Sequence, residues 1–278
     1  MQNFLDTRTD PNGESHITAL RKSPTNKSIV AEDIAMTAII LFFIIHWYAS
    51  VIAQSFFLHR YMAHGMFRMS KFWERFFYLF TFLAQGSSFL HPKSYAALHM
   101  EHHKHSDTEE DPHSPHFFQD VYSMMKNTAV VYFEFKTGKR DSSSPKINAL
   151  PTWPLIDQLG NSHFVRIGFC CVYALFYYIF APSPIWWLLL PFHFLMGPIH
   201  GAFVNWCGHK YGYRNHDTPD ESRNTFAWDL LFVGETFQNN HHRFPNRANF
   251  ANRWYECDVL YPFILTLNKL QIIKLNKT

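Results

Sequence analysis

The stretch Leu98-His99-Met100-Glu101-His102-His103 places three histidines at positions i, i+3 and i+4. On an α-helix these positions lie on one face, one turn apart. Three neighbouring imidazoles form a metal-binding surface, and imidazole suits iron, zinc, copper and nickel. One such cluster is weak evidence by itself, and the metal centre is predicted from its combination with the other histidine motifs of the chain.

Three further motifs extend the pattern. Two histidines lie five residues apart in His59-Arg60-Tyr61-Met62-Ala63-His64. The stretch Gln238-Asn239-Asn240-His241-His242 repeats the central spacing with glutamine first, and Asn205 precedes His209 by four residues. Eight imidazoles exceed the four ligands of a structural zinc site and suffice for two metals. The candidate ligands are His59, His64, His99, His102, His103, His209, His241 and His242.

The spacing of His59 and His64 constrains the backbone between them. Five residues of α-helix turn by roughly 500°, so the two side chains do not share a face of a continuous α-helix. If both bind one centre, the helix must end or unwind between them. Gly65 supports an ending there.

Apolar patterning predicts an all-α integral membrane protein with about three transmembrane helices, interfacial helices and a histidine-rich cap. Residues 35–57, 163–180 and 185–204 are long enough to cross a bilayer. A full crossing at 71–90 would put His59 and His99 on opposite faces of the membrane, so we expect that stretch to be interfacial or re-entrant. Residues 1–30 form a polar, mobile tail, and residues 31–278 form the membrane domain.

Charge sets the expected orientation. The linker 181–184 has no Lys or Arg, whereas the segment 59–163 is rich in them, so the histidine motifs should face the cytoplasm. In a bacterium this would be the inner membrane. With three spans, the N-terminus lies on the opposite side. The stretch 260–275 is expected to be an amphipathic helix that closes the cap.

The motifs resemble those of the membrane-bound fatty acid desaturases, above all the acyl-CoA, stearoyl-type delta-9 branch and its bacterial relatives. The resemblance covers residues 56–261 and includes Phe57-Leu58-His59-Arg60, Asp111-Pro112-His113 and the run from Gly234 to Pro245. It implies two iron ions (Fe2+/Fe3+) that use O2 and two electrons to remove two hydrogens from an acyl chain. The substrate would be an acyl-CoA, an acyl carrier protein conjugate or a phospholipid acyl chain, desaturated at the delta-9 position.

Two residues that are not histidines, Asn205 and Gln238, are expected on the cofactor side of the site. In the resembling family, the counterpart of Asn205 holds a metal-bound water, and a histidine ligand stands where this chain has Gln238. Gln238 can bind the metal through its oxygen, hold a water, or leave the position to another histidine, with His105 and His113 the nearest in sequence. We favour the water, because each iron would then keep four imidazoles.

Nearby residues are expected to support the ligands. Asp107 or Asp111 can orient a ligand imidazole, and carboxylates such as Glu101, Asp111 and Glu235 can offset the charge of the centre. His105, His113 and His116 lie in a turn-rich loop, where histidines are more often simply exposed. His46, His193 and His200, inside the apolar spans, are expected to make polar contacts between helices.

Composition limits the function classes. The chain has 278 residues, 18% of them aromatic, and a net charge of +3, which gives no support to nucleic-acid binding. Its four cysteines form no CxxC pair and are expected to be reduced. No Rossmann or haem-attachment motif is present in the sequence, so electrons must come from a carrier. Ferredoxin, rubredoxin or cytochrome b5, each with its NAD(P)H reductase, would suit the basic segment 243–254.

Two alternatives remain at the level of sequence. A related di-iron membrane hydroxylase acting on a fatty acid, an alkane or a carotenoid would share the histidine motifs and differ in its product. A non-enzymatic membrane metal or haem binder would need ligand pairs inside the spans, where the dense clusters do not lie. The sequence therefore favours an oxidoreductase that acts on paired donors and reduces O2 to water.

Overall fold

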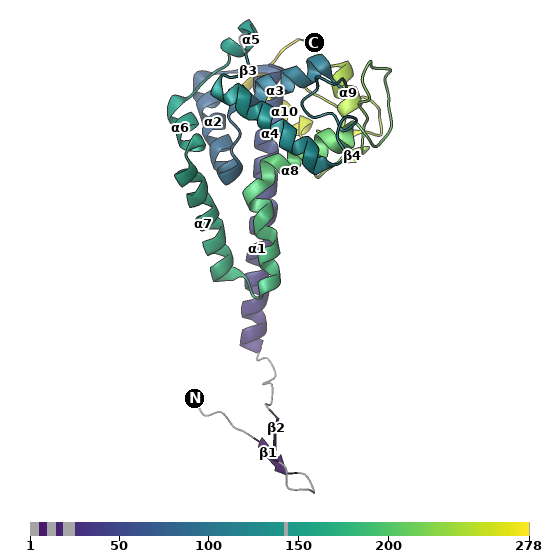
Figure 1. The fold of residues 1–278 in the computed structure, drawn as a ribbon. Helices are drawn as coiled ribbons and strands as arrows, with labels where there is room; N and C mark the ends of the chain where they lie inside the picture. Colours follow the sequence, from purple (N-terminus) through teal and green to yellow (C-terminus); the bar gives the residue numbers. More distant parts are fainter. Residues whose placement is uncertain (1–5, 10–14, 19–25, 142–143, 278) are drawn as a thin grey trace.

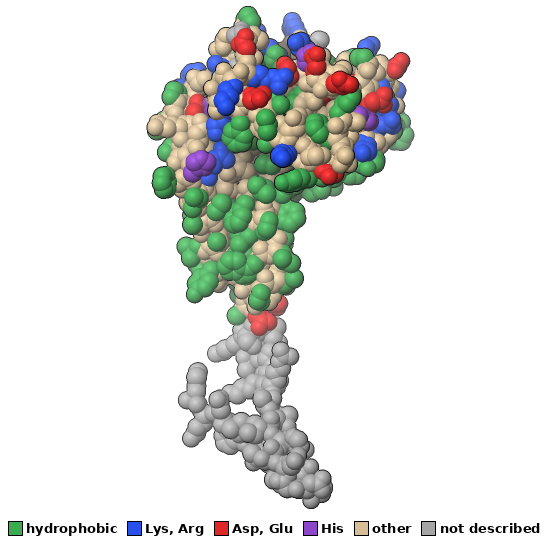
Figure 2. Space-filling view, viewed as in Figure 1, with side chains coloured by type: hydrophobic (Ala, Val, Ile, Leu, Met, Phe, Trp, Pro, Cys, Tyr) green, Lys and Arg blue, Asp and Glu red, His purple; other side chains and the backbone are tan. Residues whose placement is uncertain are grey.

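A computed structural model describes every residue except 1–5, 10–14, 19–25, 142–143 and 278. Long helices form a stalk beneath a cap of shorter helices and loops (Figure 1). Figure 2 shows the same division in the side chains: the described part of the stalk is covered mainly by hydrophobic groups, and Lys, Arg, Asp and Glu gather on the cap. The histidine motifs all belong to the cap or to its junction with the stalk.

Three helices in the described part of the chain are long and apolar enough to cross a membrane: Val30–Ala63, His163–Phe180 and Pro184–Gly208. The first combines α1 (Asn26–Ile52) with a π-helix, η1 (Ala53–Ala63). The second is α7 (His163–Phe180). The third joins a short 3-10 helix, η3 (Pro184–Leu189), to α8 (Leu190–Gly208). The number of candidate spans agrees with the prediction of about three.

The helix α8 is bent, as its prolines and glycine predict. Leu195 leaves helical geometry, with φ −129° and ψ 22°, and Pro198 lies three residues further on. Proline removes a backbone donor and clashes with the preceding turn, which is the usual cause of a sharp kink. Gly197, Pro198 and Gly201, which follow the bend, line a cavity.

The helix α2 (Lys71–Gln85) begins at Ser70, whose side chain accepts a hydrogen bond from the Trp73 amide. Its outer face carries Phe72, Phe76, Leu79 and Leu83, all exposed, while Phe77 and Tyr78 are buried. This apolar outer face suits contact with lipid. The helix is not among the three candidate spans, so all the histidine motifs lie at the same end of the stalk.

The cap is built from short helices that follow the stalk elements. After η2 (Gly86–Ser88) they are α3 (Pro92–His105), α4 (Val121–Thr137), α5 (Pro145–Asn148), α6 (Pro154–Asn161), α9 (Gln238–Arg243) and α10 (Tyr261–Lys269). Its core surrounds η1, where Phe56, Phe57, Leu58 and Met62 are almost fully buried. The first histidine motif is therefore fixed by packing on all sides.

Three short strand pairs correct the all-α expectation, although the described chain is mostly helical. The strands β3 (Phe67–Met69) and β6 (Ile273–Leu275) pair antiparallel, and β4 (Trp228–Asp229) pairs parallel with β5 (Cys257–Asp258). The stretch 260–275 is thus not one helix: α10 ends at Lys269, and β6 then pairs with the strand that follows η1. Backbone pairing with β3 outweighs the amphipathic pattern there.

The third pair, β1 (Asp6–Thr9) with β2 (Ser15–Thr18), lies within the predicted tail. Helix α1 also begins inside it, at Asn26. The mobility of this tail stays a prediction, and most of its residues lie outside the described part of the chain.

We predict that the two ends of the chain lie on opposite sides of the membrane, because an odd number of spans separates them. A small epitope tag at the N-terminus should react with antibody in intact cells. The same tag at the C-terminus should react only after the membrane is opened. Protection of both tags in intact cells would mean that one of the three helices does not cross.

Candidate metal centre

The π-helix η1 brings His59 and His64 onto one face. The His64 amide donates to the carbonyl of His59 at 3.1 Å, which is the i→i+5 bond of a π-turn. The expectation that the helix ends or unwinds between the two histidines is therefore wrong: it widens instead. A wider turn places residues five apart one above the other. Gly65, with φ +63°, ends the helix directly afterwards.

Helix α3 carries the central motif as predicted. Pro92 occupies its first turn, and the Ser94 amide donates to the His91 ring at the N-terminus. His99 and His103, four residues apart, point to one group of histidines, while His102 points to a second group. A single helix thus serves both groups.

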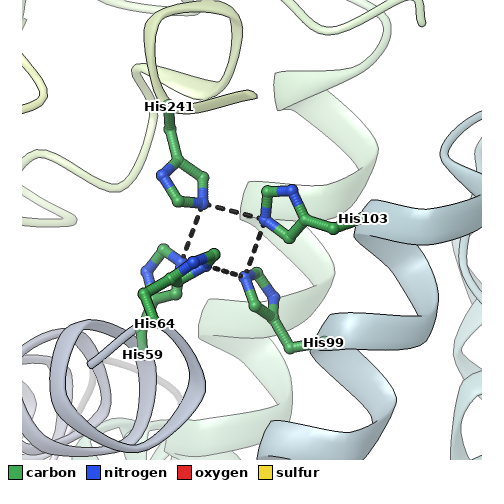
Figure 3. A group of neighbouring side chains, drawn as sticks. All are labelled: His59, His64, His99, His103 and His241. Carbon is green, nitrogen blue, oxygen red and sulfur yellow. Dashed lines mark hydrogen bonds between the residues drawn. The ribbon is translucent and has the colours of Figure 1, made fainter. Parts of the chain in front are cut away.

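The first group holds five imidazoles, from η1, α3 and α9: His59, His64, His99, His103 and His241. Their Nε2 atoms meet in a chain of close contacts (Figure 3), with 2.8 Å between His64 and His99 and 3.0 Å between His99 and His103. The chain continues to His241, which lies 2.9 Å from His103 and 3.1 Å from His59. One ligand atom from each of the five residues lies within 4.8 Å of all the others.

Such crowding requires neutral rings. Burial, and then the neighbouring imidazoles, hold the pKa of His64, His99, His103 and His241 well below the ordinary histidine value. Neutral imidazole is the form that binds metals. Five rings whose Nε2 atoms converge cannot all be satisfied by hydrogen bonds to one another, whereas a shared cation accepts all their lone pairs. The group therefore fits a metal ion.

The second group holds His102, His209 and His242. The Nδ1 of each ring donates to a carboxylate: His102 to Asp111 at 2.9 Å, His209 to Asp107 at 2.7 Å, and His242 to Asp220 at 2.7 Å. The Nε2 of each ring is buried and has no partner. A carboxylate on Nδ1 fixes the tautomer and leaves the Nε2 lone pair for a metal. These three orphaned nitrogens fit a second metal ion.

The carboxylates that hold the rings are ionised. Burial alone would raise their pKa, but the histidine partners outweigh it, so the pKa of Asp107 falls to about 2 and those of Asp111 and Asp220 fall well below the usual range. Around the first group, the Glu235 carboxylate contacts Nδ1 of His59 and accepts from Arg60. These neighbours lower the pKa of Glu235 to about 2 against the effect of burial.

The eight predicted histidines thus come together, but not as four and four. They divide into five and three, and the two groups adjoin, with 4.5 Å between the ring centroids of His103 and His242. The equal division expected from spacing alone is therefore not what the fold builds. The first group is rich in imidazoles and the second is one short of four.

Asn205 and Gln238, the two predicted cofactor-side residues, line the cavity that the first histidine group borders. The Gln238 amide nitrogen donates to the carbonyl oxygen of Glu235 at 2.6 Å. Gln238 also packs closely on Gly208, where an added Cβ would meet its Cγ at 2.4 Å. Gln238 is thus held in place by its backbone contact and by the small residue opposite.

Sequence reasoning placed some supporting residues correctly and missed others. Asp107 and Asp111 each accept a hydrogen bond from a candidate ligand ring, as expected, and Glu235, expected to offset charge, contacts the His59 ring. Glu101 does not: it pairs with Arg140 at 3.1 Å, because it points away from the ring face of α3. Asp220 was missed, since nothing in its polar loop distinguishes it from its neighbours.

The histidines of the loop after α3 and those inside the apolar helices make different contacts. His105 pairs with Glu110, and His116 donates to the carbonyl of His209, whereas His113 is buried. Within the stalk, His46 and His193 meet at 2.7 Å between their Nδ1 atoms, which confirms the expected contact between helices. His200 differs, because neither of its ring nitrogens has a partner.

A cavity of about 490 Å³ opens beside the histidines. One face of α4 lines it over three turns, with Met125, Thr128, Ala129, Tyr132, Phe133 and Lys136. His59 and His99 border it from the metal side, and Lys136 and Arg166 are its cationic residues. An apolar cavity with a few polar groups is the usual form of a small-molecule site.

The family model for fatty acid desaturases matches residues 34–264. The chain belongs to the fatty acid desaturase family. It is 30% identical to a sn-1 stearoyl-lipid 9-desaturase from Synechocystis sp., over 78% of this chain and 64% of that protein. It is 28% identical to an icosanoyl-CoA 5-desaturase from Limnanthes douglasii, over 83% and 62% of the two chains. It is also 28% identical to a sn-1 stearoyl-lipid 9-desaturase from Anabaena variabilis, over 91% and 85%. The matches thus span just under two thirds of the first two relatives.

Replacing the carboxylate behind His242 should loosen metal binding. Asp220→Asn removes the charge that holds Nδ1 of His242, so we expect a loss of ~10–100-fold in metal affinity. Competition with a chelator measures this affinity. The control is Glu221→Gln, whose exposed side chain contacts arginines instead. Equal affinities in the two variants would contradict the role given to Asp220.

Proposed function

We propose that the protein desaturates a long-chain fatty acyl substrate in an O2-dependent reaction. Two C–H bonds on adjacent carbons break and a C=C bond forms. O2 takes up the two hydrogens of the substrate together with two electrons and two protons from outside, giving two molecules of water. The observation that carries the proposal is the placement of two histidine groups beside an apolar cavity.

The resident cofactor in this proposal is a pair of iron ions. The first would be held by His59, His64, His99, His103 and His241, and the second by His102, His209 and His242. Iron supplies the O2 chemistry, while the protein fixes which carbon is presented. Asn205 and Gln238 would hold a metal-bound water through their side-chain amides, which offer both a donor and an acceptor.

The cavity supports an acyl chain as the substrate. Its α4 wall runs from Met125 to Lys136, a length of about 16 Å at 1.5 Å per residue. Burying methylene groups there contributes about 0.8 kcal/mol each. Lys136 and Arg166 would attract the phosphates of the carrier, with an acyl-CoA preferred. The delta-9 position is proposed from the names of two of the relatives.

Electrons would come from a carrier protein of the ferredoxin, rubredoxin or cytochrome b5 type with its reductase. The histidine cap would face the cytoplasm, where such carriers operate. Arg243 and Arg253 are exposed on the cap and would steer an acidic partner. Neither residue belongs to the histidine groups.

Expression with a generic redox chain should change the fatty acids of the host. Mass spectrometry of the extracted lipids should reveal a new double bond, and we expect it at carbon 9. His241→Ala should abolish the product, because it removes a ligand that touches two other rings. His105→Ala, at a histidine outside both groups, should retain it. A hydroxylated product in place of the double bond would identify the protein as a hydroxylase instead.

The role of Gln238 gives a separate prediction. Gln238→Leu should keep most of the iron and lose turnover, because leucine cannot hydrogen-bond a water. Gln238→His should still bind about two irons. His102→Ala and His241→Ala should instead lose iron together with activity. Iron content of the purified variants, measured by elemental analysis, distinguishes these cases. If Gln238→Leu lost iron as fully as His241→Ala does, Gln238 would be a direct ligand.

A further inference from the structure

The second histidine group has three imidazoles, one fewer than the four expected. Gln238 stands where the i, i+3, i+4 spacing would place the fourth histidine, and it does not supply the missing imidazole. Gln238 has no ring, and its amide nitrogen is already used on the carbonyl of Glu235. Three imidazoles leave more of a metal's coordination open here than the five of the first group do. This leaves room for a further ligand from another buried side chain.

His113 has the properties of such a ligand. Its side chain is buried, and neither Nδ1 nor Nε2 has a hydrogen-bond partner. An unsatisfied buried polar group costs about 1–3 kcal/mol, and a bound ion can remove that cost by taking the lone pair. In the described part of the chain, His200 is the other buried histidine with two unpartnered nitrogens. It lies in the membrane-spanning helix α8 and stacks on Phe232, outside every histidine group.

His113 also lies next to His102, a member of the second group. The centroid of its ring is 4.3 Å from that of His102, closer than the rings of His209 at 4.8 Å and His242 at 5.1 Å. His102, Asp111 and His113 form a third group, in which each offers a ligand atom within 4.8 Å of the others, and His102 belongs to both this group and the second.

The loop that carries His113 is anchored to the same centre. Asp111 accepts hydrogen bonds from Nδ1 of His102 and from the backbone amide of His113, at 3.0 Å in both cases for Oδ1. The carbonyl of Pro112 accepts from Asn127 at 2.9 Å, which ties the loop to α4. One carboxylate therefore positions a member of the second group and the histidine beside it.

We propose that His113 binds the second metal directly and supplies the imidazole that Gln238 cannot. The inference rests on the proposed two-metal centre and deepens it. The two groups then contain five and four imidazoles. Gln238 keeps its separate role as a residue that contacts water, and the loop after α3 becomes part of the metal site.

Metal content tests this without any measurement of activity. Protein purified with iron, and separately with zinc, should carry about two metals per chain. His113→Ala should carry about one, as His209→Ala should, because both remove a ligand of the second metal. His105→Ala, in the same loop, should keep about two. The double variant His113→Ala/Gln238→His should recover the lost metal, since it restores a fourth imidazole at position 238.

The outcomes separate the two proposals. His113→Ala protein that retains both metals at unchanged affinity would overturn the inference and leave the two-metal centre intact. Wild-type protein with a single metal would overturn both. If His113→Ala does not fold, His113→Gln preserves most of the side-chain volume and is judged by the same count. Its loss of one metal, reversed by Gln238→His, would support the inference, and retention of both would overturn it.

Discussion

The buried carboxylate of Glu235 joins the first histidine motif to the segment that leads into α9. It contacts Nδ1 of His59 and accepts hydrogen bonds from Ser55 and, at 3.1 Å, from Arg60. All three of these residues belong to η1. Arg60 is itself fully buried and reaches Asp258 at 2.9 Å. Removing one partner from a buried charged network costs about 3–5 kcal/mol, so these contacts must form together. The first histidine motif and the segment that leads into α9 are therefore assembled as one unit.

Buried carboxylates also surround the candidate metal centre as a whole. Asp107, Asp111, Asp220 and Glu235 each contact a ligand imidazole and are held ionised. Four carboxylates would match the four positive charges of the two Fe2+ ions proposed above. In the proposed two-metal centre, imidazoles would bind the ions while these carboxylates, one hydrogen bond further out, would offset the charge. This would explain how an all-histidine ligand set is tolerated inside a buried site.

The sequence predicted the features that depend on local periodicity. The i, i+3, i+4 spacing of His99, His102 and His103 gave helix α3, and apolar length gave the three candidate spans. It could not reveal the π-helix at His59 and His64, because a widened turn is stabilised by packing rather than by residue type. Asp220 and the five-to-three division of the histidines were also hidden, since both depend on contacts between segments distant in sequence.

The central claim is that the histidines hold two metals side by side at one end of the stalk. Anomalous diffraction at the iron absorption edge, from crystals of the purified protein, tests it most directly. The account predicts two peaks, one among His59, His64, His99, His103 and His241, and one among His102, His209 and His242. A single peak, or a peak outside both groups, would contradict it.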